Sequence, residues 1–289
     1  MEFLTLSVLN GLSYGLLLFM LSAGLTLIFS MMGVLNFAHA SFYMLGAYLA
    51  SAISTHLGFG LALWLAPLAV GGLGAVFEAT CLRRVRSQGH VAELLLTFGL
   101  SFVLLEVVQW LWGRGPVPYP VPSWLQGPMF SLYDMPFARY RVFIMGLSAL
   151  VLGGLWLALA QTRLGLLLQA ALTHPKATEA LGHNVPRLFT GVFAGGAALA
   201  GLAGVLGGNL FVTEPGMAAT VGSVIFVVVV VGGLGSLLGA FLASLLLGLL
   251  QTLALELAAL RSLAPVLPFL GMVLMLVLRP QGLMGRRGA

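Results

Sequence analysis

Residues 142–161 read VFIMGLSALVLGGLWLALAQ, and the 26 residues that follow, Thr162–Arg187, read TRLGLLLQAALTHPKATEALGHNVPR. The first segment has the length and composition of a membrane-spanning helix, which needs about 20 apolar residues. The second segment is polar, and a further apolar run, residues 188–210, comes after it. This order predicts two membrane spans joined by a polar loop on one side of the membrane.

The composition of the whole chain extends this interpretation. The chain has 289 residues, of which 60% are hydrophobic and 7% are charged, whereas a soluble domain carries roughly 25% charged residues. The apolar runs are continuous and do not alternate with polar residues, which excludes a transmembrane β-barrel. The sequence therefore predicts an all-α integral membrane protein with a single transmembrane domain over residues 1–289.

Eight apolar runs are long enough to be spans, and a ninth is shorter. The long runs are residues 4–32, 40–57, 61–82, 92–112, 142–161, 188–210, 237–257 and 262–278. The shorter run, residues 221–231, is predicted to be half of a discontinuous helix, with the break at Gly232, Gly233 and Gly235. These three glycines are also candidate residues of the translocation pathway or gate. The prediction is thus about eight to nine transmembrane elements.

Basic residues gather at the ends of the spans. Nine of them follow the third, fifth and last spans, which the positive-inside rule places in the cytoplasm: Arg83, Arg84, Arg86, Arg163, Lys176, Arg187, Arg279, Arg286 and Arg287. The N-terminus is then outside and the C-terminus inside. Because the cations lie at span ends, the net charge of +5 does not indicate nucleic-acid binding.

Two patterns concern how the spans pack. Small residues recur at four-residue spacing, which predicts close helix packing within the chain, with association between subunits as the alternative. The pairs are Gly11/Gly15, Gly71/Ala75, Gly191/Gly195, Ala197/Gly201, Gly204/Gly208 and Gly235/Gly239. In addition, each half of the chain has a span followed by a break, near Asn36–His39 in the first half and near Gly216 and Gly222 in the second, which suggests an inverted repeat.

The polar loop, residues 162–187, contains a short helix with recognisable ends. Pro175 suits the first helical position and Gly182 the position just past the end. A short charged helix between two spans predicts a docking surface for a soluble partner. Its candidate residues are His174, Pro175, Lys176, Ala177, Thr178, Glu179, Ala180, Leu181 and Gly182.

The segment Gly33–Ala40 reads GVLNFAHA and interrupts two apolar runs. Asn36 and His39 are costly in hydrocarbon unless they face protein, water or the headgroup region. One interpretation is a polar turn at the inner surface, with Asn36 capping the next helix. The other is a break that lines a translocation pathway or forms an inner gate, in which Phe37 takes part.

Acidic residues within spans are the next candidates. Glu106 and Gln109 share one face of the fourth span, and Glu106 has either a structural role or a place in the pathway. Glu78, Glu93 and Glu256 lie near span ends, where we expect them to be solvated. Glu106 has no partner that would form a proton relay, which argues against a proton-driven carrier.

No enzyme motif is present in the sequence. There is no GxxxxGK[ST], Gly-x-Ser-x-Gly or HExxH pattern, and the single cysteine, Cys81, excludes an internal disulfide. We therefore predict no catalytic residues, no metal site and no cofactor. The proline-rich connection between residues 113 and 140 is either a solvated loop or a platform for an external partner.

Several segments together resemble a known family. They are GLTLIFSMMGVLNFAHASFYMLGAYLA (Gly24–Ala50), the loop Thr162–Arg187, AGLAGVLGG (Ala200–Gly208), VGGLGSLLGAFLASLLLGLL (Val231–Leu250) and LRPQGLMGRR (Leu278–Arg287). The chain resembles branched-chain amino acid ABC transporter permeases of the LivH type along nearly its whole length. It departs from their usual pattern at Gln169, at His183-Asn184 and at Leu238.

The resemblance implies one half of the membrane part of an importer in the bacterial inner membrane, surrounded by membrane lipid. A second permease subunit, usually a paralogue, would pair with it, and an extracytoplasmic substrate-binding protein would deliver the amino acid. Two cytoplasmic ATP-binding subunits would hydrolyse ATP and dock on Pro175–Gly182. The alternatives are a permease for another small solute, such as urea or a sugar, a stand-alone carrier or channel, and a membrane scaffold.

Overall fold

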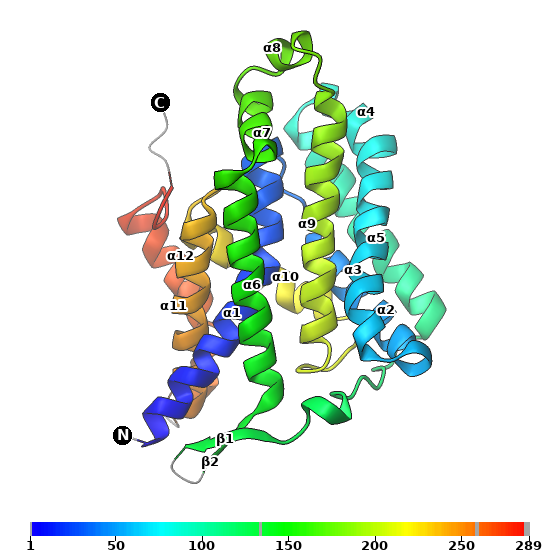
Figure 1. The fold of residues 1–289 in the computed structure, drawn as a ribbon. Coiled ribbons are helices and arrows are strands. Elements are labelled where there is room, and N and C mark those ends of the chain that lie inside the picture. The colour runs from blue at the N-terminus through cyan, green and yellow to red at the C-terminus, as the bar shows by residue number, and fades with distance from the viewer. Residues whose placement is uncertain (1, 133–134, 258–259, 286–289) are drawn as a thin grey trace.

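The computed structural model describes residues 2–132, 135–257 and 260–285, which form a helical bundle with one small β-hairpin at one end (Figure 1). The helices are α1 (Glu2–Met32), α2 (His39–Leu57), α3 (Phe59–Phe77), α4 (Arg83–Val85), α5 (His90–Trp112), α6 (Arg139–Gln161), α7 (Arg163–Thr173), α8 (Pro175–Ala180), α9 (Val185–Gly207), α10 (Met217–Gly232), α11 (Leu237–Glu256) and α12 (Leu267–Leu278). The remaining elements are the π-helical turn η1 (Glu78–Leu82), the 3-10 turns η2 (Arg86–Gln88), η3 (Ser123–Leu125) and η4 (Arg261–Leu263), and the antiparallel strands β1 (Pro128–Leu132) and β2 (Met135–Ala138).

The helices confirm an all-α integral membrane protein. Within the described ranges, six helices are long and apolar enough to cross a membrane: α1, α3 with its extension to Gln88, α5, α6, α9 and α11. Helices α10 and α12 are shorter, with 16 and 12 residues, while α2 has 19 residues and is largely buried. Each predicted span coincides with a helix, so the chain is a multi-pass membrane protein.

The predicted polar loop, residues 162–187, is mostly helical. Helix α6 stops at Thr162, whose side-chain oxygen accepts a hydrogen bond from the Gly165 backbone N–H at 3.4 Å and starts α7. Helix α8 begins with Pro175 and is followed by Gly182 at a φ of +87°, as the sequence predicts. Because α7 continues from α6, it carries α8 to the end of the molecule opposite the hairpin (Figure 1).

Close helix packing runs through the centre of the bundle, where α1 and α9 meet most of the other helices. At Gly248 of α11, an added Cβ would lie 2.5 Å from the Gly15 Cα of α1, so the two backbones are almost in contact. Gly46 of α2 meets Gly201 of α9 in the same way. Small residues permit this because lipid provides no hydrophobic force between helices and van der Waals contact must replace it.

The predicted pairs of small residues mostly pack within the chain. Gly191 and Gly195 are different, because nothing lies within 4 Å of the position of an added Cβ at either residue. Gly233 and Gly235, at φ values of +98° and +81°, form the turn that reverses the chain between α10 and α11. The expected break within a helix is therefore a tight turn between two helices.

The two halves of the chain have comparable layouts. Helix α1 runs from the hairpin end toward the α8 end, and α9 runs in the opposite direction (Figure 1). Helix α1 is followed by the irregular segment 33–38 and then by α2, and α9 is followed by the irregular segment 208–216 and then by α10. Helices α2 and α10 pack against each other. This arrangement agrees with the predicted inverted repeat.

The connection between α5 and α6 crosses the hairpin end of the bundle (Figure 1). Its backbone pairs with the α9–α10 connection, since the Val117 N–H donates to the Thr213 oxygen at 2.8 Å. The Tyr119 hydroxyl donates to the Val205 oxygen at 3.1 Å and the Tyr140 hydroxyl to the Leu206 oxygen at 2.7 Å. Burial raises the pKa of Tyr119 to about 12, so its hydroxyl stays protonated and keeps donating to α9.

Candidate functional site

The segment between α1 and α2 returns deep into the bundle. His39, the first residue of α2, contacts the Leu21 oxygen through Nε2 at 2.9 Å. Leu21 precedes the end of α1 by 11 residues, about 16 Å along the helix axis. The segment is therefore not a turn at the surface, and α2 starts beside the middle of α1.

Local hydrogen bonds satisfy part of this irregular backbone. The Ala38 N–H donates to Asn36 Oδ1 at 3.1 Å, and the Phe37 N–H donates to Thr97 Oγ1 of α5 at 3.3 Å. Ala38 is the N-terminal cap residue of α2, so Asn36 forms a turn before the helix and does not cap it. Irregular backbone at this depth is tolerated only where protein or a cavity covers it.

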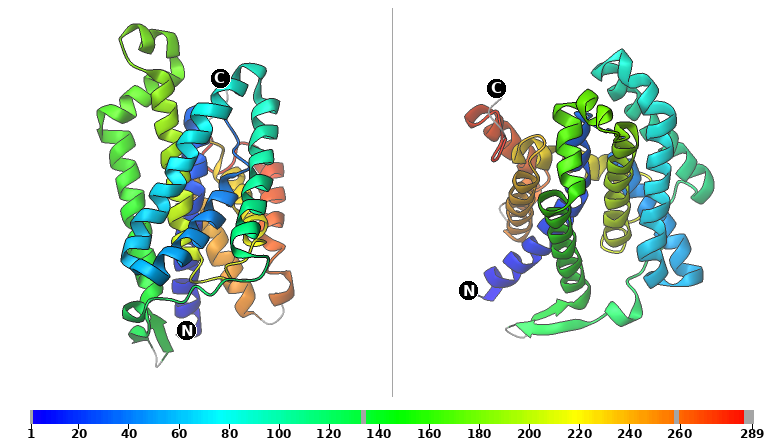
Figure 2. Two further views of the ribbon diagram at one scale, coloured as in Figure 1. Left: turned by 90° about the vertical axis from the view of Figure 1, so that its right-hand side faces the viewer. Right: turned by 45° about the horizontal axis from the view of Figure 1, so that its top comes forward.

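A cavity of about 590 Å³ adjoins this segment. It lies between α2, α5, α10 and α12. Of these helices, α5 and α12 lie on the side of the bundle away from α6 (Figure 2). Its apolar wall is rich in aromatic rings, whose members are Phe37, Phe98, Phe102, Phe226 and Phe269. All five are exposed, so the cavity opens on the molecular surface between α5 and α12.

The polar part of the wall comes from the α1–α2 segment and the neighbouring helices. Asn36 and His39 are 3% and 1% exposed. Asn36 Nδ2 and His39 Nδ1 are buried and have no hydrogen-bond partner. Because Nε2 must donate to the Leu21 carbonyl, Nδ1 of the neutral ring is an acceptor, while Asn36 Nδ2 is a donor. An apolar cavity with a few such groups suits a small molecule with an apolar body and a polar end.

The structure brings only some of the predicted pathway residues to this cavity. Asn36, Phe37 and His39 line it, together with Gln109. Glu106 is exposed on α5 and does not line the cavity. Gln109, which the sequence places on the same face of α5, thus lies at the cavity, while the Glu106 carboxylate lies on the exposed surface.

The three predicted glycines lie outside the cavity, at the α10–α11 turn. Here the segment after α12 packs against the end of α10: the Leu283 N–H donates to the Val231 oxygen at 2.8 Å, and the Met284 N–H to the Gly232 oxygen at 3.1 Å. An added Cβ at Gly233 would lie 2.5 Å from the Gly285 nitrogen. These glycines therefore permit contact between two backbone segments.

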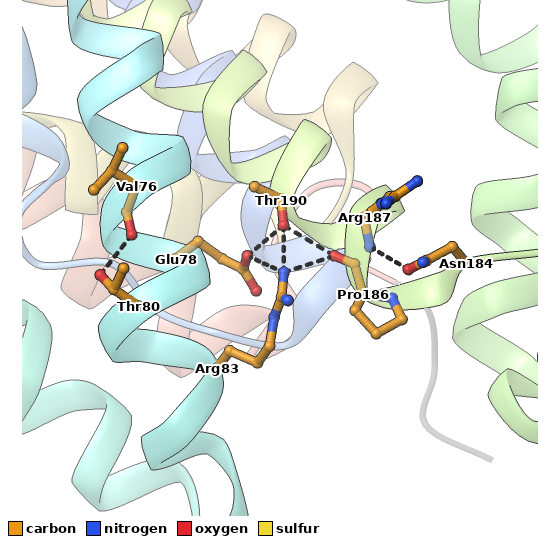
Figure 3. Close-up of polar contacts among 8 residues, drawn as sticks. All are labelled: Val76, Glu78, Thr80, Arg83, Asn184, Pro186, Arg187 and Thr190. Carbon is orange, nitrogen blue, oxygen red and sulfur yellow. Dashed lines mark hydrogen bonds and ion pairs between the residues drawn. The ribbon is translucent and has the colours of Figure 1, made fainter.

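A buried ionic cluster links the start of α9 to the turn after α3 (Figure 3). Glu78 is 1% exposed, and its Oε2 accepts hydrogen bonds from Arg83 Nη2 at 3.1 Å and from Thr190 Oγ1 at 2.6 Å. Arg83 Nη2 also donates to Thr190 Oγ1 at 2.6 Å and to the Pro186 oxygen at 3.2 Å. The expectation that Glu78 is solvated is wrong, because the π-turn Glu78–Leu82 directs it toward α9.

A second buried carboxylate reinforces the same region. Glu93 is 3% exposed and pairs with Arg86, whose Nε lies 3.7 Å from Glu93 Oε1. Arg86 Nη2 donates to the Met32 oxygen at 3.1 Å, and its guanidinium carbon lies 4.5 Å from the ring centroid of Phe189 on α9. Glu93 is thus also buried and not solvated as expected, and Arg86 connects the ends of α1 and α9.

Sequence reasoning placed Arg83 and Arg86 at a span end but did not pair them with carboxylates. Glu78 and Arg83 are five residues apart, a spacing that brings side chains together in a π-turn and not in an α-helix. Cys81 belongs to the same turn and is exposed. The sequence therefore indicated these ion pairs only through the presence of acidic residues near arginines.

Helix α8 presents most of its side chains to solvent. Thr178 is its one buried residue, and Leu181, directly after it, is 80% exposed. The Asn184 side chain accepts a hydrogen bond from the Arg187 N–H at 3.1 Å and caps α9. A displacement of α8 would thus act directly on the start of α9, which the two carboxylate clusters join to α3 and α1.

In the part of the chain that the structure describes, no three His, Cys, Asp or Glu side chains come together as a metal site would require. The arrangement that the geometry does offer is an open apolar cavity, an exposed helix at one end and buried polar contacts between them.

Comparison with known proteins gives a consistent result. A family model described as "Branched-chain amino acid transport system / permease component" matches residues 7–278. The high-affinity branched-chain amino acid transport system permease protein BraD of Pseudomonas aeruginosa is 29% identical over 294 residues, covering 96% of this chain and 95% of BraD. The LivH permease proteins of Salmonella typhimurium and Escherichia coli are 28% and 27% identical, each over 96% of this chain and 94% of the relative. No solved structure matches the chain.

Proposed function

The chain belongs to the branched-chain amino acid transport permease family, and from this premise we propose that it is the membrane subunit of an ATP-driven importer for branched-chain or other hydrophobic amino acids. The observation that carries the proposal is the match along nearly the whole chain. Helix α8 is exposed and leads into α9, which Arg83 and Arg86 contact, and the bundle holds an apolar cavity; these features give that match a physical interpretation.

The proposed complex contains three further kinds of partner. Two cytoplasmic ATP-binding subunits dock on residues 174–182, and an extracytoplasmic protein delivers the amino acid at the hairpin end. A second permease subunit, a paralogue, covers the open side of the cavity between α5 and α12. Glu106 then faces that subunit, because an ionised carboxylate facing lipid would be costly.

The distribution of charge supports the proposed orientation in a bacterial inner membrane. The α8 end of the molecule carries Arg83, Arg84, Arg86, Lys176 and Arg187 on its turns and helix ends (Figure 1). Basic residues of short loops concentrate on the cytoplasmic side. We therefore place the α8 end in the cytoplasm and the N-terminus outside.

In the proposed cycle, closure of the ATP-binding subunits moves α8, and the contacts of Arg83 and Arg86 carry this motion to α3 and to the end of α1. Segment 33–38 follows α1 directly, so the polar side chain that it contributes to the cavity wall changes position relative to α10. Asn36, Phe37 and His39 act as pathway or gate residues, and the turn at Gly232, Gly233 and Gly235 lets α10 move with its neighbours. Access thereby alternates between the two sides of the membrane.

The test is charge reversal on α8. Glu179→Arg should lower leucine uptake at least tenfold and reduce co-purification of the ATP-binding subunits, since like charges placed in an interface are strongly unfavourable. Arg114→Glu, at the hairpin end, is the matched control and should leave co-purification of these subunits unchanged. Unchanged leucine uptake by Glu179→Arg at equal expression would contradict the docking role and favour a stand-alone carrier.

The cargo is tested on the reconstituted complex. Uptake of leucine, isoleucine or valine that depends on ATP would support the proposal. Uptake of urea or a sugar in their place would favour the alternative of a permease for another small solute.

A further inference from the structure

A second cavity system lies at the hairpin end of the bundle. A cavity of about 330 Å³ is lined by residues of α1, α6, α11 and the α9–α10 connection. Helices α6 and α11 both pack against α1, so the cavity lies between them with α1 as its floor. Its volume is within the range of small-molecule sites, about 300–1,000 Å³.

Opposite charges line this cavity from two different helices. Arg141 of α6 and Glu256 of α11 are both half-buried. They are close enough to interact electrostatically, yet the ion pairs of the described residues leave both out. The hydrogen-bond partner of Arg141 is Asn10 Oδ1. A cation and an anion that line one cavity of a membrane protein without pairing are functional candidates.

A third side chain that lines this cavity carries an unsatisfied polar atom. Gln251 Oε1 is buried and has no hydrogen-bond partner. Gln251 lines the charged cavity and also an adjoining cavity of about 300 Å³. A buried amide oxygen without a donor costs about 1–3 kcal/mol, so a donor supplied by a ligand would be favourable here.

Most of the side chains that line the adjoining cavity are apolar, among them Leu17 and Leu18 of α1 and Val221 and Val224 of α10. Besides Gln251, its polar members are Glu214, Thr220, Tyr14 and Tyr43. A molecule that spans the two cavities would therefore meet a cation and an anion at one end and aliphatic side chains at the other. An α-amino acid with an apolar side chain has this distribution of charge and surface.

We propose that the two adjoining cavities form a zwitterion-binding site within this chain, in addition to the apolar cavity on the opposite face. Arg141 binds the carboxylate, Glu256 and Gln251 bind the ammonium group, and the aliphatic wall receives the side chain. This inference rests on the proposed function for its substrate class. It adds a site at which the membrane subunit itself selects amino acids.

The test uses ligands that lack one charge. Binding of L-leucine, leucinamide (no carboxylate) and 4-methylpentanoate (no ammonium) is measured by competition on the complete complex in lipid nanodiscs. Both analogues should bind the wild type about tenfold or more weakly than leucine, because a hydrogen bond to a charged group contributes about 1.5–3 kcal/mol. Arg141→Gln should weaken leucine to a similar extent without weakening leucinamide further. Glu256→Gln should likewise weaken the binding of leucine without further weakening the binding of 4-methylpentanoate.

Arg139→Gln is the matched control, since Arg139 lies on the same helix but does not line the cavity, and it should not alter the preference. Arg141→Lys retains the charge and should recover part of the leucine affinity. If Arg141→Gln and Glu256→Gln fold and keep wild-type preference among the three ligands, the site is wrong while leucine uptake still supports the importer. If the wild type neither binds leucine nor takes it up, the proposed function itself fails.

Discussion

Among single residues, Glu78 tests whether the buried cluster holds the bundle together. Glu78→Gln retains the size of the side chain but leaves Arg83 without its counter-charge. Removing one member of a fully buried pair costs about 3–5 kcal/mol. Because the Arg83 side chain is 40% exposed and can turn toward water, we expect a smaller loss, about 1–2 kcal/mol.

The measurement is thermal unfolding in detergent, with a double-mutant cycle over Glu78→Gln and Arg83→Leu. The double variant should lose less stability than the two single variants lose together, because it removes both charges and leaves neither one unpaired. Glu179→Gln on exposed α8 is the control and should leave the melting temperature unchanged. Additive effects would show that the pair contributes no coupling energy.

At the scale of helices, the contact of α1 with α11 makes a sharp prediction. Gly248→Ala places a Cβ 2.5 Å from the Gly15 Cα, and the two helices must move apart. Overpacking of this kind costs about 1–3 kcal/mol. Gly195→Ala, at a helical position with open space around it, should instead be neutral or stabilising by about 0.5–1 kcal/mol. Equal melting temperatures for the two variants would contradict the packing described for α1 and α11.

Features set by local chemistry were predictable from the sequence. The bounds of α8 follow from the fixed φ of proline at Pro175 and the positive φ available to Gly182. The position of segment 33–38 was not predictable in this way, because the depth of His39 depends on its contact with Leu21 in another helix. The same is true of Gly233, whose turn and backbone contacts involve segments far apart in the chain.

For the whole molecule, the apolar runs and their charge bias predict the class and the spans, since the bilayer imposes both. The residues that line the two proposed sites were harder to find. Asn36 and His39 stand out as polar residues among apolar ones, but Arg141 comes from α6 whereas Gln251 and Glu256 come from α11. Only the packing of α6 and α11 on α1 brings these three together.

The open face between α5 and α12 also makes a prediction at this scale. Phe102 of α5 is 54% exposed, and Leu150, which is 68% exposed, belongs to α6, which lies on the other side of the bundle from α5 and α12 (Figure 2). In a Cys81→Ser background, Phe102→Cys should cross-link to a cysteine scanned along the second permease, and Leu150→Cys should not. Cross-linking that is equal from both positions would contradict the proposed pairing face.

Helix α9 is held by side chains at both of its ends. Arg83 and Thr190 fix one end, and the hydroxyls of Tyr119 and Tyr140 fix the other. Its 23 residues extend for about 34 Å between them. In mechanical terms, the helix is stiff along its axis and receives force at both of its ends. A push delivered at Pro186 would therefore arrive at the opposite end as a displacement of the α5–α6 connection, so that, in the proposed importer, the hairpin end would report the position of α8.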